Sequence, residues 1–121
     1  SITGLEDRAE MLQIIYSTQL YSYSLVEMYN SLCDKIGTGN YTNEDVIQAQ
    51  QYFEMAKEAK LQEYRICRNI TQGVLDGALF ESAEDKQETL NVLAKIDQEI
   101  SRLEDLSFPV SMYKRKGGGF R

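Results

Sequence analysis

The side chains that most often perform chemistry in proteins are scarce in this chain of 121 residues. It contains no histidine and two cysteines, Cys33 and Cys67. Without histidine, Ser-His-Asp and Cys-His catalysis, histidine-ligated zinc and the Glu-x-x-His ligand sets of di-iron bundles are excluded. The absence of histidine therefore excludes most classes of enzyme that a helical chain of this size could form. We predict a protein that is not an enzyme and that needs no cofactor.

Carboxylate pairs are the remaining candidates for acid-base work or for cation binding. Glu54 and Glu58, and likewise Glu84 and Glu88, lie four residues apart beside lysines. No acidic loop with the spacing of a calcium site accompanies them. Residues 37–39 (Gly-Thr-Gly) lack the preceding strand and the following Lys-Ser/Thr of a phosphate-binding loop. We interpret the paired acids as solvated helix faces and predict no metal site.

The two cysteines are too far apart along a helical hairpin to form a disulfide. If the chain turns near residue 40, Cys33 lies opposite about residue 47, and Cys67 then lies about 30 Å away along the helix axis. A disulfide needs Cα atoms within about 7 Å of each other. We therefore predict two free thiols, as is usual in a reducing compartment.

The sequence shows no pattern of membrane insertion or secretion. No window approaches the roughly 18 to 20 uninterrupted apolar residues of a membrane span, and the first ten residues are acidic where a signal peptide is basic and then apolar. The sequons at Asn40 and Asn69 are interpreted as chance matches. The expected location is the cytoplasm or a soluble assembly.

Capping signals and glycines divide the chain into three helical segments, predicted at about residues 5–36, 43–75 and 83–106. A hydroxyl stands three residues ahead of a carboxylate near the start of each, at Thr3, Thr42 and Ser82, which is close to the capping-box pattern. Loops of about six residues favour antiparallel neighbours. The predicted fold is all-α, an elongated antiparallel three-helix bundle over residues 1–106, followed by an irregular tail over 107–121.

Apolar periodicity indicates which side of each segment is buried. The third segment has the cleanest seam, formed by Thr89, Leu93, Ile96, Ile100 and Leu103, with Leu90 alongside. The first segment is more apolar than a three-helix core requires, because its polar strip covers only about a third of the circumference. The excess must be covered by the tail folding back, by a copy of the chain, or by another protein.

The first segment is also rich in tyrosine, which offers a large rigid contact area with a polar end. The chain has eight tyrosines, and four of them fall between residues 16 and 29. We predict a protein interface on this segment, formed by Tyr16, Tyr21, Tyr23, Leu25, Met28 and Tyr29.

Charge is distributed unevenly between the body and the tail. The chain has 13 basic and 19 acidic residues, and residues 107–121 carry four cations and no acid. A body this acidic does not attract nucleic acid, so any such contact must come from the tail. The predicted tail contacts, which alternate cations with aromatic rings, are Tyr113, Lys114, Arg115, Lys116, Phe120 and Arg121.

These observations favour a non-enzymatic subunit of a protein assembly, a structural or secretion- or virion-type component that acts through helix-mediated contacts. Its partner is then itself, as a homo-oligomer, or a helical client. The first alternative is a small adaptor or export chaperone that binds an amphipathic helix of a client. The second is a nucleic-acid-associated protein that acts through the tail. In outline the chain resembles small secretion chaperones and subunits of bacterial or viral assemblies.

Overall fold

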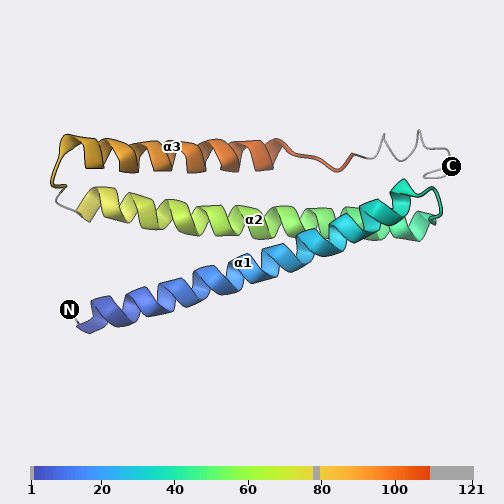
Figure 1. Ribbon diagram of the computed structural model, residues 1–121, viewed down its shortest axis with the longest axis horizontal. Helices are drawn as coiled ribbons and strands as arrows, with labels where there is room; N and C mark the ends of the chain where they lie inside the picture. Colours follow the sequence, from blue (N-terminus) through green and yellow to red (C-terminus); the bar gives the residue numbers. More distant parts are fainter. Residues whose placement is uncertain (1, 78–79, 110–121) are drawn as a thin grey trace. The chain divides into compact units, whose positions relative to one another are not determined.

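The structure, a computed structural model, describes residues 2–77 and 80–109, without the side chains of residues 2–8 and 11. It contains three helices, α1 (Ile2–Gly37), α2 (Asn43–Gly77) and α3 (Ala83–Asp105), with α1 packing on α2 and α2 on α3 (Figure 1). No strand occurs in the described residues. The predicted all-α, three-helix fold is therefore confirmed, and the predicted helix ends lie within three residues of the observed ones.

The chain divides into two compact units. The first is formed by α1, the part of α2 up to Ala59 and the segment that begins at Ser107, and the second by Lys60–Leu106. Helix α2 therefore contributes to both units. Each unit contains one hairpin of two antiparallel helices, and each is described separately below.

The core of the first unit lies between the second half of α1 and the first half of α2. On α1 the packed positions recur every three or four residues, at Leu25, Tyr29, Leu32 and Ile36, as a single helical face requires. Helix α2 packs against these positions with five buried residues, three of which are alanines: Val46, Ala49, Phe53, Ala56 and Ala59. Small side chains allow the two helix axes to approach closely, so the large side chains of α1 become buried.

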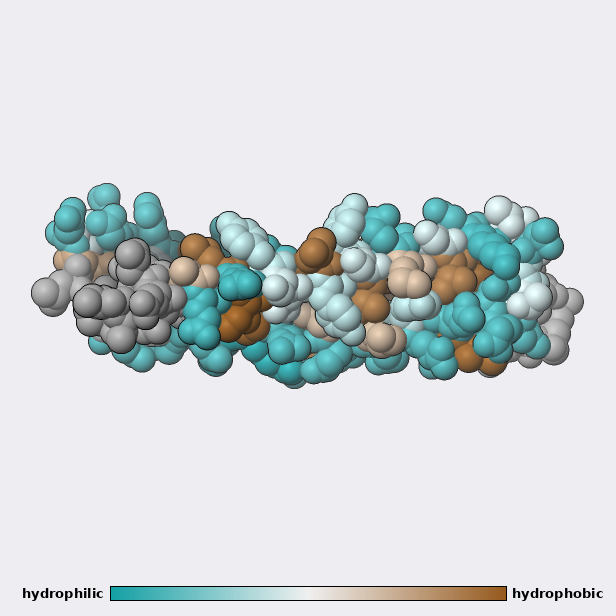
Figure 2. All heavy atoms as spheres, turned by 90° about the horizontal axis from the view of Figure 1, so that it is seen from below, coloured by the Kyte–Doolittle hydropathy of each residue, from teal (hydrophilic) through white to brown (hydrophobic). Residues whose placement is uncertain are grey.

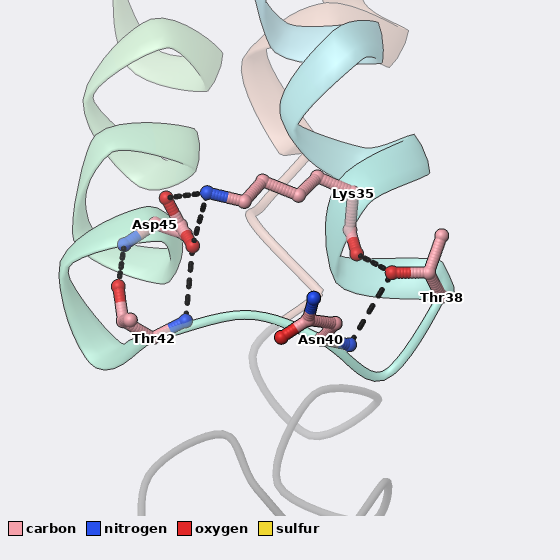
Figure 3. A network of polar contacts seen from close by, with 5 residues as sticks. All are labelled: Lys35, Thr38, Asn40, Thr42 and Asp45. Carbon is pink, nitrogen blue, oxygen red and sulfur yellow. Dashed lines mark hydrogen bonds and ion pairs between the residues drawn. The ribbon is translucent and has the colours of Figure 1, made fainter.

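The turn between α1 and α2 is held by a polar network (Figure 3). Gly39 has a φ of +83°, a conformation that favours glycine, and its N–H donates to the carbonyl of Ile36. The Asp45 N–H donates to Thr42 Oγ1 (3.2 Å), and the Thr42 N–H donates back to Asp45 Oδ2 (2.9 Å). Lys35 Nζ reaches from α1 to Asp45 Oδ2 at 3.0 Å. The turn thus joins both helices through the same carboxylate.

Two of the three predicted caps are observed. Thr42 and Asp45 satisfy each other's backbone, and the Asp85 N–H donates to Ser82 Oγ at the start of α3. The hydrogen bond from the Thr42 N–H, followed by that from Lys35, lowers the pKa of Asp45. The prediction at Thr3 is wrong, because α1 already begins at Ile2.

Replacing Thr42 by alanine is expected to lower the free energy of unfolding by about 1 kcal/mol, because the Asp45 N–H loses its acceptor. Urea titration followed by circular dichroism measures the change. Thr71→Ala is the matched control, since the Thr71 hydroxyl donates to a carbonyl within α2 and caps nothing. If the two substitutions cost the same, Thr42 does not act as a cap.

In the second unit, the ion pair between Arg68 and Asp97 joins α2 to α3, and the charge interaction between Tyr64 and Arg102 indicates the same relative direction of the two helices. Arg68 Nε on α2 bonds Asp97 Oδ1 on α3. Farther along both helices, the pKa of Arg102 is raised by its hydrogen bond and charge interaction with Glu99, with a smaller contribution from Tyr64 of α2. Residue numbers thus rise along one helix as they fall along the other, which is the antiparallel register.

The predicted seam of α3 is only partly buried. Leu103 is buried, while Thr89, Leu93, Ile96 and Ile100 are half-buried and Leu90 is exposed. Among the described residues, no helix has the length and apolar content that a membrane span requires.

Candidate protein-binding surface

The six predicted interface residues of α1 separate into two groups. Leu25 is buried against Ala56 and Ala59, and Tyr29 packs against the rings of Phe53 and Phe108. These two side chains belong to the core of the first unit, because they lie on the face that α2 covers. The other four are exposed and remain available to a partner: Tyr16, Tyr21, Tyr23 and Met28.

Four large exposed side chains form a row on α1 that we call the outer stripe, namely Leu12, Tyr16, Leu20 and Tyr23. Their spacings of four, four and three residues place them within an arc of about 80°. Each is between 50% and 69% exposed. The arc lies on the side of α1 opposite the packed residues Leu25, Tyr29 and Ile36, so it faces away from the part of α2 that belongs to the first unit.

Leu12 and Leu20 were not among the predicted interface residues, which were chosen around the four tyrosines of residues 16–29. Their spacing from Tyr16 and Tyr23 is the signal that identifies them. Leu12, Ile14, Tyr16 and Leu20 of α1 are all exposed, and Figure 2 shows brown apolar side chains at the molecular surface, in groups among teal polar ones. Apolar side chains therefore reach the solvent along this helix.

The Ser24 hydroxyl, which lies beside the outer stripe, is already satisfied by its own helix, because Ser24 Oγ donates to the carbonyl of Leu20 (3.0 Å). A hydroxyl bonded in this way loses little when water is removed, since its donor keeps a partner. Ser24 is therefore compatible with burial against another protein.

Charge is nearly absent from this part of α1. Residues 9–33 contain two charged side chains, Glu10 and Glu27, whereas the 23 residues of α3 contain ten. Charged residues are depleted from the centres of protein interfaces. The composition of α1 thus matches that of an interface rather than that of a solvated helix.

An open pocket of about 340 Å³ lies in the first unit, at the junction of α1 and α2. Met28 and Leu32 of α1 and Tyr52 of α2 supply its apolar wall, and Glu27, Ser31 and Gln48 supply polar groups. Met28 stands seven residues after Tyr21 and fourteen after Ile14, and all three are exposed. Ile14, Tyr21 and Met28 therefore lie on one side of α1 at seven-residue spacing, and Met28 ends this series at the pocket.

The groups considered for chemistry remain apart from this surface. Glu54, Glu58, Glu84 and Glu88 lie on exposed faces of α2 and α3. In the described part of the chain, no three cysteine or acidic residues are grouped as metal ligands would be. Neither Cys33 nor Cys67 is in a disulfide, in agreement with the prediction. Burial, followed by the charge of Glu63, raises the pKa of Cys67.

Cys67 is expected to react slowly with iodoacetamide at neutral pH, because only the thiolate is nucleophilic and its raised pKa reduces the thiolate fraction. Its rate should still be rising at pH values where an unperturbed thiol has levelled off. Mass spectrometry of the Cys33→Ser variant over a pH series measures this rate. A profile that coincides with that of a model thiol peptide would contradict the raised pKa, and an intramolecular disulfide in the wild type would contradict the structure.

The predicted tail contacts Tyr113, Lys114, Arg115, Lys116, Phe120 and Arg121 lie outside the described residues. The tail is described as far as Pro109, and its Phe108 is buried against Tyr29 and Phe53. Phe108 thus covers part of α1 at Tyr29, beside the core and away from the outer stripe, and the folding back of the remaining tail residues stays a prediction. The chain matches no protein-family model, no curated protein sequence and no solved structure.

Proposed function

We propose that this protein is a non-enzymatic subunit of a protein assembly and that the outer stripe of α1 is its contact surface. The carrying observation is the exposure of Leu12, Tyr16, Leu20 and Tyr23 on one side of a helix segment with almost no charge. Large apolar side chains that are contiguous and exposed are typical of binding sites.

The expected result is that the molar mass, measured by light scattering at several concentrations, rises above that of the 13.9 kDa monomer. The double substitution Tyr16→Ser with Leu20→Ser should return the mass to the monomer value, because it removes the centre of the apolar row. Both side chains are mostly exposed, so the helix itself should persist.

The matched control is Ile47→Ser with Met55→Ser, which removes two equally large exposed side chains from α2. This variant should retain the wild-type mass at every concentration, and circular dichroism should show the same helix content in both variants. A mass that stays at the monomer value at every concentration, or that responds equally to both double variants, contradicts the proposed function.

The second candidate is an adaptor or export chaperone, and the pocket at Met28, Leu32 and Tyr52 favours it. An amphipathic helix of a client would insert one apolar side chain there. Titration of a labelled amphipathic peptide, followed by fluorescence anisotropy, tests this role. Met28→Ser should weaken the binding of the peptide about tenfold and leave the mass unchanged, whereas Tyr16→Ser with Leu20→Ser should leave the binding unchanged.

Nucleic-acid binding through the tail stays a prediction, and removal of residues 110–121 should abolish such binding if it exists. We also propose that the protein is located in the cytoplasm or in a soluble assembly.

A further inference from the structure

We propose that the partner of the outer stripe is a second copy of this chain, bound antiparallel along α1 with the two-fold axis between Ser17 and Thr18. This inference rests on the proposed function and names the partner and its orientation. Surface area, charge and the order of side chains along the stripe each support it.

The exposed area of the stripe supplies the larger part of one side of a dimer interface. With a full area of about 200 Å² for each large side chain, the exposed fractions of Leu12, Tyr16, Leu20 and Tyr23 leave about 500 Å² in contact with water. A stable interface buries about 800 Å² on each partner. The stripe thus supplies more than half of one side of an interface, and the residues that flank it can supply the rest.

Charge favours a copy of the chain over a partner of opposite charge. A two-fold contact places the same surface on both sides, so every charge near the axis meets its own kind. Although the whole chain has a net charge of −6, residues 9–33 carry only Glu10 and Glu27. Two such surfaces can meet at little electrostatic cost, whereas a charged partner would find almost nothing here to pair with.

The order of side chains favours the antiparallel orientation. With the axis between Ser17 and Thr18, Leu12 lies opposite Tyr23 of the second copy, and Tyr16 lies within about one residue of the position opposite Leu20. Each ring then meets an aliphatic side chain, so large and smaller groups alternate across the contact. A parallel pair would instead place Tyr16 against Tyr16 and Leu20 against Leu20, which interdigitates less well.

The hairpin of the first unit leaves room for this arrangement. The residues that pack α1 on α2 begin near Ser22 and lie on the opposite side of α1 from the stripe. In the antiparallel pair, the two α1–α2 hairpins extend from opposite ends of the contact. Within the first unit, the part of α2 up to Ala59 therefore does not compete with the second copy for the stripe.

Engineered cysteines test the orientation in a background of Cys33→Ser and Cys67→Ser. One variant carries Leu12→Cys and a second, of distinguishable size, carries Tyr23→Cys. When the two are mixed and mildly oxidised, we expect a disulfide between the different variants. In the antiparallel pair, the two copies of position 12 lie about 17 Å apart along the axis, which is beyond the reach of a disulfide. Each variant alone should therefore stay uncrosslinked.

A second measurement avoids any change in the stripe. Single spin labels at Gln13 or at Asn30, both exposed and outside the row, report the distance between copies by pulsed resonance. In the antiparallel pair the distance at Asn30 should exceed that at Gln13 by about 20 Å, because Asn30 lies farther from the axis. In a parallel pair the two distances should be similar.

The outcomes separate the orientation from the proposed function. Cross-linking between the different variants with unequal label distances supports the antiparallel dimer. Cross-linking of each variant with itself, or equal distances, overturns the orientation, while the rise in mass leaves the proposed function standing. A monomer at every concentration overturns the second copy as partner and contradicts the proposed function as well. Leu20→Ser alone should weaken the dimer at least about tenfold, and Met55→Ser should not.

Discussion

Replacing Phe53 by alanine is expected to lower the free energy of unfolding by about 3 to 5 kcal/mol. Phe53 is buried in the first unit between the rings of Tyr29, at a centroid distance of 5.6 Å, and Phe108, at 5.8 Å. Tyr29 and Phe108 also contact each other, at 6.4 Å. Removal of the Phe53 ring leaves a cavity between Tyr29 and Phe108. Because these two rings lie on different segments of the chain, we expect that they cannot move together to fill it.

Urea denaturation followed by circular dichroism measures this loss, and Met55→Ala is the matched control. Met55 lies two residues along the same helix and is 45% exposed, so its replacement should change stability by no more than about 0.5 kcal/mol. A double-mutant cycle with Phe108→Ala adds a sharper criterion, because two rings in contact should show a coupling of about 0.5 to 1.5 kcal/mol. Additive losses would mean that Phe108 does not pack on Phe53.

The helices were predictable because the signals that start and stop them are local. The capping pairs at Thr42 and Ser82 act within three residues, and Gly39 adopts its positive φ within the turn itself. Apolar periodicity was enough to place Leu103 on the buried side of α3. Such features depend on neighbours along the chain, and these can be read directly from the sequence.

Contacts between distant segments could not be predicted in the same way. Phe108 follows the end of α3 and is 55 residues from Phe53, so no periodic pattern links them. The sequence also did not show which side of α1 packs against α2, since apolar residues occur on most of the circumference of this helix. Leu25 and Tyr29 became core residues because Ala49, Ala56 and Ala59 make one side of α2 small enough to receive them. The outer stripe is the part of that apolar excess which α2 leaves exposed.

Replacing Leu103 by alanine is expected to lower the free energy of unfolding by about 2 to 5 kcal/mol, because Leu103 is the buried side chain of α3. Leu90 is the informative control: sequence periodicity places it alongside the same seam, yet it is 40% exposed. Leu90→Ala should therefore cost less than about 1 kcal/mol, since a substantial part of the removed side chain already contacts water. Both variants keep the helix propensity of α3 high, because alanine is the best helix former, so any difference reports packing rather than helix formation. Equal losses in urea titrations of the two variants would show that the seam is buried along its whole length, as periodicity alone implies, and that the ranking of these two side chains by exposure is wrong.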